Sequence, residues 1–325
     1  MKAVWKEILY AFVLGAVVPG MLIWFGTALM DLQKEQSPGS TLQNIAVQQE
    51  MPLYEISVRT GEGVENKSLE DYLVGVVLAE MPASFEEEAL KAQAVVARTY
   101  TVRADVTGGK HKDGSVCTDY ACCQAYIEQE EYLSRGGSAD NLEKIRSAVA
   151  DTAGLVLTYE GQLIEATYFS CSGGSTEDAL AVWGTDYPYL QATPSPGEEK
   201  ATHFTDTVSF TPEQFQQALG TSFSGTPDSW FGTVTYTEGG GVDSMEIGGR
   251  AYKGTKLRQL LSLRSTAFTV SAGDVITITT RGYGHRVGMS QYGADAMAVS
   301  GKSYADILAY YYHGTSLVPY SAVGN

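Results

Sequence analysis

An almost wholly apolar run near the start of the chain, ILYAFVLGAVVPGMLIWFGTALM, occupies residues 8–30. A helix needs about 20 apolar residues to cross the hydrocarbon core of a bilayer, so this run is long enough to span a membrane. Lys2 and Lys6 precede it, and positive charge is typical of the cytoplasmic flank. The run therefore predicts a cytoplasmic segment over 1–7 and a single-pass anchor in the cell membrane over 8–30, with the remaining chain outside the cytoplasm.

A cleaved signal peptide is the alternative for the same run. The apolar region of a signal peptide usually has about 7–15 residues and ends at a cleavage site of the A-x-A type. The run over 8–30 is longer, and no clear site of that type follows it, so we favour the anchor. Residues 31–52 are polar and include a Pro-Gly-Ser sequence, which is typical of a tether. We expect the folded domain over 53–319 and a tail over 320–325.

Charge and length limit the class of this protein. The 325 residues are enough for one or two domains with a buried core. The formal net charge is −16, and the sequence shows none of the basic clusters that nucleic-acid-binding proteins usually carry. We therefore expect no nucleic-acid partner, although a local basic groove is compatible with an acidic chain.

Periodicity and capping signals predict a mixed fold. Alternating apolar and polar residues over 54–59 indicate a short strand. Serine followed three residues later by Asp or Glu predicts helices that begin at Ser68, Ser84 and Ser303. After Gly154 the pattern becomes β, with a hairpin in LVLTY-EG-QLIEATY and further strands in TVTYT and VITITT. Because helices and strands are segregated along the chain, we expect an α+β fold in which a helical lobe packs with an antiparallel β-rich region.

Glu80 lies on the apolar stripe of the first predicted helix, four residues after Val76 and seven after Leu73. It also lies in the last turn, where backbone carbonyls make the helix end negative. Burial and the negative helix end both favour the protonated form, so we expect a raised pKa and the role of a general acid. The alternative is a frayed helix end with Glu80 solvated, and periodicity alone favours that alternative.

The second predicted helix carries two cations, Lys91 and Arg98, which are seven residues apart and therefore share a face. The small neighbours of Arg98 would let a ligand approach closely, so both side chains could bind acid or amide groups. The alternative is a solvated charged face.

Four ordered segments resemble the stage II sporulation protein D family and the related lytic amidase enhancers. The longest reads EDYLVGVVLAEMPASFEEEALKAQAVVARTY, and the others begin ATYFSCSGGST, KLRQLLSLRST and RGYGHRVGMSQYG. The resemblance covers essentially residues 53–318. It implies a lytic transglycosylase that acts on peptidoglycan, with a preference for glycan strands stripped of stem peptides, during the engulfment step of sporulation.

Residue by residue, the resemblance implies that Glu80 in the EMP motif is catalytic. It places substrate-site residues at Lys91 and Arg98, and further contacts at Ser172 and Gln291. Glu80 would protonate the oxygen between N-acetylmuramic acid and N-acetylglucosamine, and its carboxylate would then accept the proton of the C6 hydroxyl as that oxygen closes on C1. Because no external water attacks, the second carboxylate of most glycoside hydrolases is not required.

The amidase enhancers suggest the alternative function, a non-catalytic activator that binds glycan and stimulates a cell-wall amidase. The resemblance also implies stage II sporulation proteins P and M as partners. The chain departs from the family pattern at Arg286, where the family usually has glycine. We expect the neighbouring His285 to be structural rather than catalytic.

A cluster of potential metal ligands lies in HKDGSVCTDYACCQAY. Thiolate and imidazole groups are the usual ligands of tetrahedral zinc, but the H-x5-C-x4-C-C spacing is not that of a standard zinc finger. Some members of the family resembled carry zinc in this stretch. We expect a structural zinc ion, held by His111, Cys117, Cys122 and Cys123. The alternative is a disulfide, for example between Cys171 and one of the other cysteines.

Overall fold

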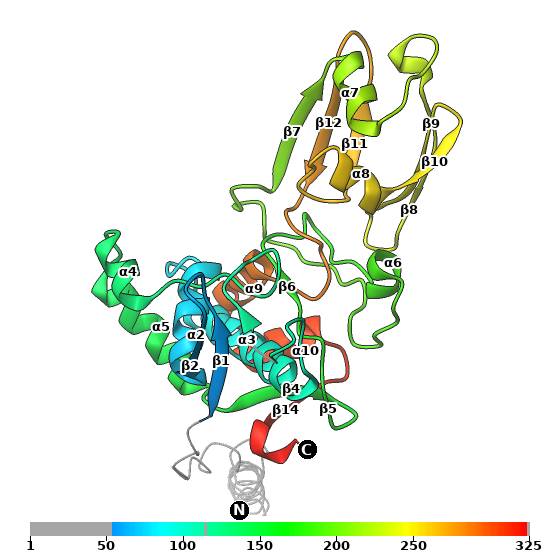
Figure 1. The fold of residues 1–325 in the computed structure, drawn as a ribbon. Coiled ribbons are helices and arrows are strands. Elements are labelled where there is room, and N and C mark those ends of the chain that lie inside the picture. The colour runs from blue at the N-terminus through cyan, green and yellow to red at the C-terminus, as the bar shows by residue number, and fades with distance from the viewer. Residues whose placement is uncertain (1–53, 114–115, 324–325) are drawn as a thin grey trace, which may run out of the picture. The chain divides into compact units, whose positions relative to one another are not determined.

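The computed structural model describes residues 54–113 and 116–323, all of which belong to a compact unit that spans 53–325 (Figure 1). The predicted cytoplasmic segment, anchor and tether lie outside the described residues. Within the described ranges, every helix is too short or too polar to cross a bilayer.

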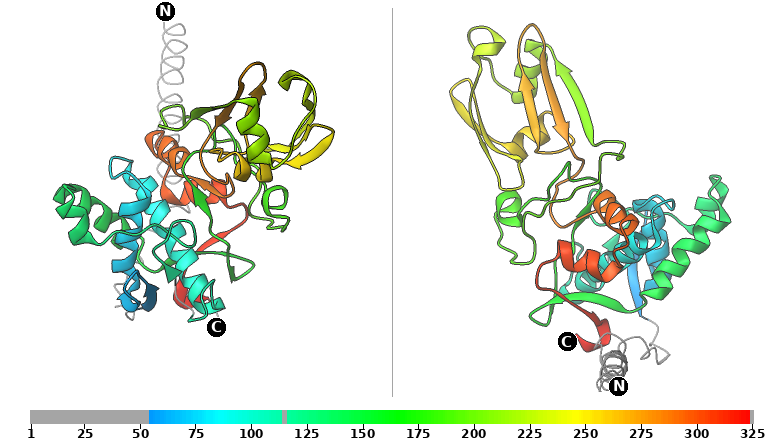
Figure 2. Two further views of the ribbon diagram at one scale, coloured as in Figure 1. Left: turned by 45° about the horizontal axis from the view of Figure 1, so that its top comes forward. Right: turned by 180° about the vertical axis from the view of Figure 1, so that it is seen from behind.

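The helical body is built around α3 (Glu87–Thr107), which is buried along most of its length. α2 (Leu69–Glu80), α5 (Ala139–Asp151), α9 (Gln291–Val299) and α10 (Tyr304–Tyr311) all contact α3, so both ends of the described chain contribute to one core (Figures 1 and 2). This core consists of aliphatic and aromatic side chains from these helices and the strands beside them. The shorter helices are α4 (Gln129–Ser134) and α6 (Ala179–Trp183).

Three small sheets surround the helical body. One has the order β2-β1-β3, and its strands are Val64–Ser68, Glu55–Arg59 and Val116–Cys117. A second has the order β14-β4-β5, and its strands are Ser316–Pro319, Leu155–Tyr159 and Gln162–Leu163. The third pairs β6 with β13 in parallel, and its strands are Tyr168–Phe169 and Met289–Ser290. In the β6–β13 pair, Met289 lies opposite Tyr168. The pair brings β6, which lines the cavity described below, next to the segment that leads into Gln291, which lines it too.

A second hydrophobic core lies in residues 205–281, which we call the β lobe. Two antiparallel three-stranded sheets form it (Figure 2). The sheet β11-β12-β7 contains Phe268–Ser271, Ile276–Arg281 and Thr205–Phe210, and the sheet β10-β9-β8 contains Arg250–Lys253, Val242–Ile247 and Phe231–Tyr236. The helices of the β lobe are α7 (Pro212–Leu219), which contacts β7, and α8 (Gly254–Leu260), which contacts β9 and β10. Single 3-10 turns cover Pro227–Ser229 and Tyr320–Ala322.

The predicted α+β class, with antiparallel sheets, is confirmed, and the predicted helix starts were correct at two of three positions. Ser303 caps α10 in a full capping box, and Ser68 precedes α2. The predicted start at Ser84 was wrong, because α3 begins only at Glu87. The intervening turn is held by tertiary contacts: Phe85 packs edge-on against Tyr292 at 4.9 Å, and the Glu86 amide donates to Asp295 on α9.

Candidate active site

Glu80 is the last residue of α2 and lines a cavity of about 1050 Å³. The helix does not fray there, since the Met81 amide donates to the Val77 carbonyl at 3.0 Å. Seven residues of α2 pack into the core and hold the helix in place. Glu80, at the end of this helix, is therefore partly buried. Burial raises the pKa of its carboxyl group. The interpretation of Glu80 as a solvated end is therefore excluded.

Three groups oppose this pKa elevation without overcoming it. The Ala125 amide donates to Glu80 Oε1 at 2.8 Å, and Tyr168 and Gln291 also lower the pKa of the carboxyl group. The Tyr168 hydroxyl has no partner at full hydrogen-bonding geometry, so we treat its interaction with Glu80 as a weak one. The carboxyl group thus has one firm donor and can be protonated or ionised in place.

The cavity contains one other carboxyl group among the described residues, that of Glu165. It forms an ion pair with Arg103 at 2.6 Å. The Glu165 carboxylate is therefore engaged by a guanidinium group. Among the described residues that line the cavity, Glu80 has the carboxyl group that lies outside an ion pair.

Aromatic side chains give the cavity surfaces suited to sugar rings. Tyr120 is 82% exposed and Trp183 is 40% exposed, although both are large apolar groups. Tyr187 and Tyr283 line the same cavity. Concave sites that combine aromatic faces with a few polar groups are typical of ligand-binding sites. The sequence prediction missed these residues, although Trp183, Tyr187 and Tyr283 lie in the segments that resemble the family.

His285 lies in the cavity wall as a neutral imidazole. Its Nδ1 accepts from the Val287 amide at 3.1 Å, which requires an unprotonated nitrogen. Burial and the nearby charge of Arg258 lower the pKa of His285 to about 4, against the effect of a hydrogen bond to the Tyr168 backbone. With both nitrogens engaged, the ring fixes the loop to β6, consistent with the structural role expected for it.

The two predicted cations of α3 are engaged elsewhere. Arg98 is fully buried and forms a bidentate ion pair with Glu70, at 2.9 Å and 2.6 Å. It also donates to the carbonyls of Val149 and Leu155. Arg98 thereby connects α2, α3, α5 and β4, and it does not line the cavity.

Lys91 is likewise surrounded by acids. Its Nζ lies 2.7 Å from Glu87, 3.0 Å from Asp151 and 3.3 Å from Glu88. It is absent from the cavity lining. Its contacts connect the start of α3 to the end of α5.

Ser172 and Gln291 differ in position, although both are buried. Gln291 begins α9, lines the cavity beside Glu80 and donates weakly to Gln93 at 3.5 Å. Ser172 instead bonds to the buried Glu198, through its hydroxyl at 2.9 Å and its amide at 2.7 Å. Of the four predicted substrate contacts, the structure brings only Gln291 into the cavity with Glu80.

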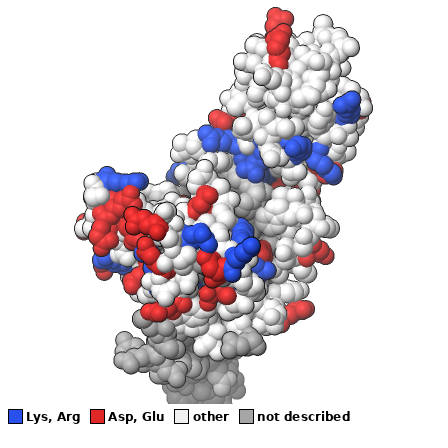
Figure 3. Space-filling model, in the orientation of Figure 1, with Lys and Arg blue, Asp and Glu red and all other residues white. Residues whose placement is uncertain are grey.

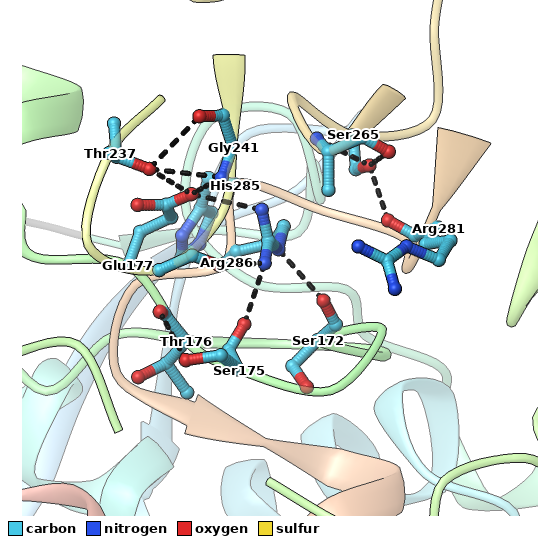
Figure 4. Close-up of polar contacts among 12 residues, drawn as sticks. Ser172, Ser175, Thr176, Glu177, Thr237, Gly241, Ser265, Arg281, His285 and Arg286 are labelled. Atoms are coloured by element: carbon cyan, nitrogen blue, oxygen red, sulfur yellow. Dashed lines mark hydrogen bonds and ion pairs between the residues drawn. The ribbon is translucent and has the colours of Figure 1, made fainter. Parts of the chain in front are cut away.

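Arg286 has a left-handed backbone with φ of 67°, a conformation that suits glycine. Its guanidinium group is buried and pairs with Glu177 at 2.9 Å. Figure 4 shows this group also donating to the carbonyls of Ser172 and Ser175, and a further bond reaches Gly239 in the β lobe. Arg286 therefore adopts a backbone conformation that suits glycine, and its side chain forms a network between the β lobe and the rest of the unit.

The four predicted metal ligands lie together. One ligand atom from each of His111, Cys117, Cys122 and Cys123 lies within 4.8 Å of the others, so the cluster could hold a metal ion. All four cysteines of the chain are free, and Cys171 instead donates to Glu198. The disulfide alternative is thus not observed.

Comparison with known proteins identifies the family. The site combines one carboxyl group of raised pKa with aromatic side chains around a single cavity. The SpoIID family model, described as "Stage II sporulation protein", matches residues 59–159. Together with the relatives described next, this match shows that the chain belongs to the SpoIID family of sporulation proteins, and the predicted family is confirmed.

The relatives match over most of this chain. Stage II sporulation protein D of Bacillus subtilis (strain 168) is 44% identical over 273 residues, covering 82% of this chain and 78% of that protein. Stage II sporulation protein D of Bacillus amyloliquefaciens is 43% identical with the same coverage. The amidase enhancer of Bacillus subtilis is 32% identical over 309 residues, covering 76% of this chain but 40% of the enhancer.

Proposed function

We propose that this protein is a lytic transglycosylase that cleaves the bond from N-acetylmuramic acid to N-acetylglucosamine in peptidoglycan glycan strands. The observation that carries the proposal is the isolation of Glu80. Its carboxyl group has a raised pKa, and the other carboxyl group of the cavity is ion-paired. A single acid that later serves as a base suits a reaction in which the substrate supplies its own nucleophile.

The reaction uses one carboxyl group twice, first as an acid and then as a base. Glu80 donates its proton to the glycosidic oxygen, the bond to C1 breaks, and N-acetylglucosamine leaves with a new hydroxyl group. The Glu80 carboxylate then accepts the proton of the C6 hydroxyl, and O6 bonds to C1 to give the 1,6-anhydro end. The Ala125 amide, 2.8 Å from Glu80 Oε1, stabilises the carboxylate between these steps. The protonated acid is regenerated without a water molecule entering the products.

The second candidate function is a non-catalytic activator that binds glycan and stimulates a cell-wall amidase. The 32% identity to the amidase enhancer favours it. The two functions differ in product. Mass spectrometry of amidase-treated peptidoglycan incubated with the purified protein should detect 1,6-anhydro ends, and Glu80→Gln should abolish them while glycan binding persists. Glycan binding by the wild-type protein without anhydro product would support the activator.

Among the predicted substrate contacts, we propose that Gln291 touches the sugar, because it is the one beside Glu80. Lys91, Arg98 and Ser172 support the site indirectly in this proposal, through the ion pairs and the Glu198 bonds described above.

We further propose that the His-Cys cluster holds a structural zinc ion. Tetrahedral zinc, with Zn–S about 2.3 Å and Zn–N about 2.0 Å, separates two sulfurs by about 3.8 Å and a sulfur from a nitrogen by about 3.5 Å. The Cys122 and Cys123 sulfurs are 3.9 Å apart, and they lie 3.7 Å and 3.5 Å from His111 Nε2. Four protein ligands would leave no position for a water, so the ion would hold the loop in place and take no part in proton transfer.

The cellular setting is part of the same proposal. A glycan-cleaving domain outside the cytoplasm agrees with the anchor expected over residues 8–30, and the sporulation family agrees with a role in engulfment. Stage II sporulation proteins P and M are the proposed partners.

A further inference from the structure

The cavity contains a cation that the sequence prediction did not identify. Arg258, on α8 of the β lobe, lines the cavity together with Glu80 and is half-buried. Lys110 also lines it, but Lys110 is exposed and donates to the Cys122 carbonyl. Figure 3 shows basic side chains over α8 and the nearby strand ends, whereas acidic side chains gather over α4 and α5.

Among the described residues, Arg258 differs from the other buried or half-buried arginines because it pairs with no carboxylate. Arg98, Arg103, Arg264 and Arg286 each pair with one. Arg258 donates from Nε to the Arg264 carbonyl at 3.3 Å. Its two terminal nitrogens form no hydrogen bond with the described residues and can bind a ligand.

An unpaired guanidinium group is costly to bury. Burial lowers the pKa of Arg258, which reflects the loss of water around the charge. A cation in this position is stabilised when a ligand supplies an anion. The chain carries a net charge of −16, so its overall field repels anionic strands and a local cation is needed to hold one.

The surroundings of Arg258 are suited to a sugar. Its charge acts directly on His285, whose ring lies 5.4 Å from that of Trp183. The guanidinium group therefore lies near an exposed indole face on which a sugar ring can stack. A carboxylate attached to such a sugar is the ligand that this arrangement suits.

In peptidoglycan the muramic acid residue carries a lactyl ether. Its carboxyl group is an amide while a stem peptide is attached, and it is a free carboxylate once the peptide has been removed. A planar guanidinium group forms two parallel hydrogen bonds with a carboxylate, which an amide cannot accept in the same way.

We propose that Arg258 binds the lactyl carboxylate of muramic acid and thereby makes the cavity selective for glycan strands without stem peptides. This inference rests on the proposed glycan-cleaving function of the same cavity.

The test uses two forms of one substrate. Amidase-treated strands retain free lactyl carboxylates, and carbodiimide coupling of the same strands with methylamine gives neutral amides. Wild-type protein should show a kcat/KM about 10- to 100-fold higher on the carboxylate strands, mainly through KM, since charge-assisted hydrogen bonds are removed by amidation. Arg258→Gln should lose that preference, through a larger fall in kcat/KM on the carboxylate strands than on the amidated strands.

Two variants control for charge and geometry. Lys256→Gln removes the same charge from the same helix, at an exposed residue that contacts only Gln259, and should keep the preference. Arg258→Lys keeps the charge but lacks the planar guanidinium group that forms two parallel hydrogen bonds. It should show part of the preference that Arg258→Gln loses. An equal loss on both substrates in Arg258→Gln would overturn the proposal.

Binding distinguishes this proposal from the function on which it rests. In the Glu80→Gln background, the affinity for carboxylate strands should exceed that for amidated strands, and Arg258→Gln should remove the difference. If these affinities are observed but the wild-type protein forms no anhydro product, the Arg258 assignment is supported and the transglycosylase function is rejected. If strands that retain stem peptides bind best and Arg258→Gln removes that advantage, the guanidinium group binds a stem-peptide carboxylate and the proposal is wrong.

Discussion

Burial of the Glu80 carboxyl group determines the pH dependence that we expect. Its pKa lies above the usual glutamate value, and the protonated form is the reactive one. The kcat/KM for denuded strands should therefore fall about tenfold per pH unit above that pKa. Initial rates of anhydro-end formation measure this limb. Glu143→Gln, at a side chain that is 74% exposed, should leave the limb in place, and a rate that rises with pH would contradict the assignment of Glu80 as the acid.

The same residue makes a prediction about stability. A carboxyl group whose pKa is raised on folding contributes stability below its unfolded pKa, and this contribution is lost as the pH rises through the folded pKa. Glu80→Gln should therefore raise the free energy of unfolding above the folded pKa, and by less in acid. Urea titrations at two pH values test the sign of this change in the free energy of unfolding. A Glu80→Gln variant that is less stable than the wild-type protein at high pH would contradict the prediction.

The buried pair of Arg286 and Glu177 gives a third prediction at the residue scale. Removing one partner leaves a buried charge uncompensated, so Arg286→Gly should cost about 3–5 kcal/mol in the free energy of unfolding. Arg286→Gly with Glu177→Gln should recover part of that loss, because the second change removes the stranded charge. The exposed pair Lys253–Asp243 is the control, and Lys253→Ala should cost less than about 1 kcal/mol. Equal costs at the two sites in urea titrations would contradict the structural account.

At the scale of elements, the segment that follows the metal ligands connects the cluster to the acid. Gln124 and Ala125 directly follow Cys122 and Cys123. The side-chain amide of Gln124 donates to Thr101 on α3, and the backbone amide of Ala125 donates to Glu80. Metal removal should loosen this segment and weaken the Ala125 bond. Since that bond lowers the pKa of Glu80, chelation should shift the alkaline limb of the rate profile to higher pH.

Elemental analysis and a pH profile before and after chelation measure both parts of this prediction. The purified protein should contain one equivalent of zinc. Cys123→Ser should lose the metal, while Cys171→Ser, which changes a cysteine outside the cluster, should retain it. If the alkaline limb of the rate profile does not shift in metal-free protein, the metal cluster does not affect the pKa of Glu80 and the prediction is wrong.

Local signals predicted the elements better than their ends or their partners. The capping box at Ser303 and the strand LVLTY were visible because both depend on nearby residues. The start of α3 was not, because Phe85 and Glu86 are held by α9, about two hundred residues later. Pairing of β6 with β13 and of β7 with β12 likewise depends on contacts distant in sequence.

The residues of the candidate site also differ in whether local sequence signals could predict them. Glu80 could be predicted because its helical position and its motif agree. Arg258 could not, since only the folded β lobe brings α8 to the cavity and only the ion pairs of the other arginines show that it is unpaired. Lys91 and Arg98 lie in a segment that resembles the family, and that resemblance predicted substrate contacts for both. Their acid partners lie on α2, on α5 and at the start of α3, and helical periodicity did not reveal these partners.

For the whole molecule, the compact unit that begins at residue 53 should work without the preceding residues. Deleting residues 1–30 should leave kcat/KM on soluble strands within about twofold, because the described residues that line the cavity begin at Ala79, inside the compact unit. The same deletion should move the protein from the membrane fraction to the soluble fraction of cells. Continued membrane association would contradict the predicted anchor.

The network around Arg286 makes the two members of its ion pair unequal. Without the Glu177 carboxylate, the guanidinium group would still donate to the carbonyls of Ser172, Ser175 and Gly239. Without the guanidinium group, the buried Glu177 carboxylate would keep bonds from Thr237 and the Gly241 amide but no cation. The chain should therefore tolerate loss of the acid better than loss of the base.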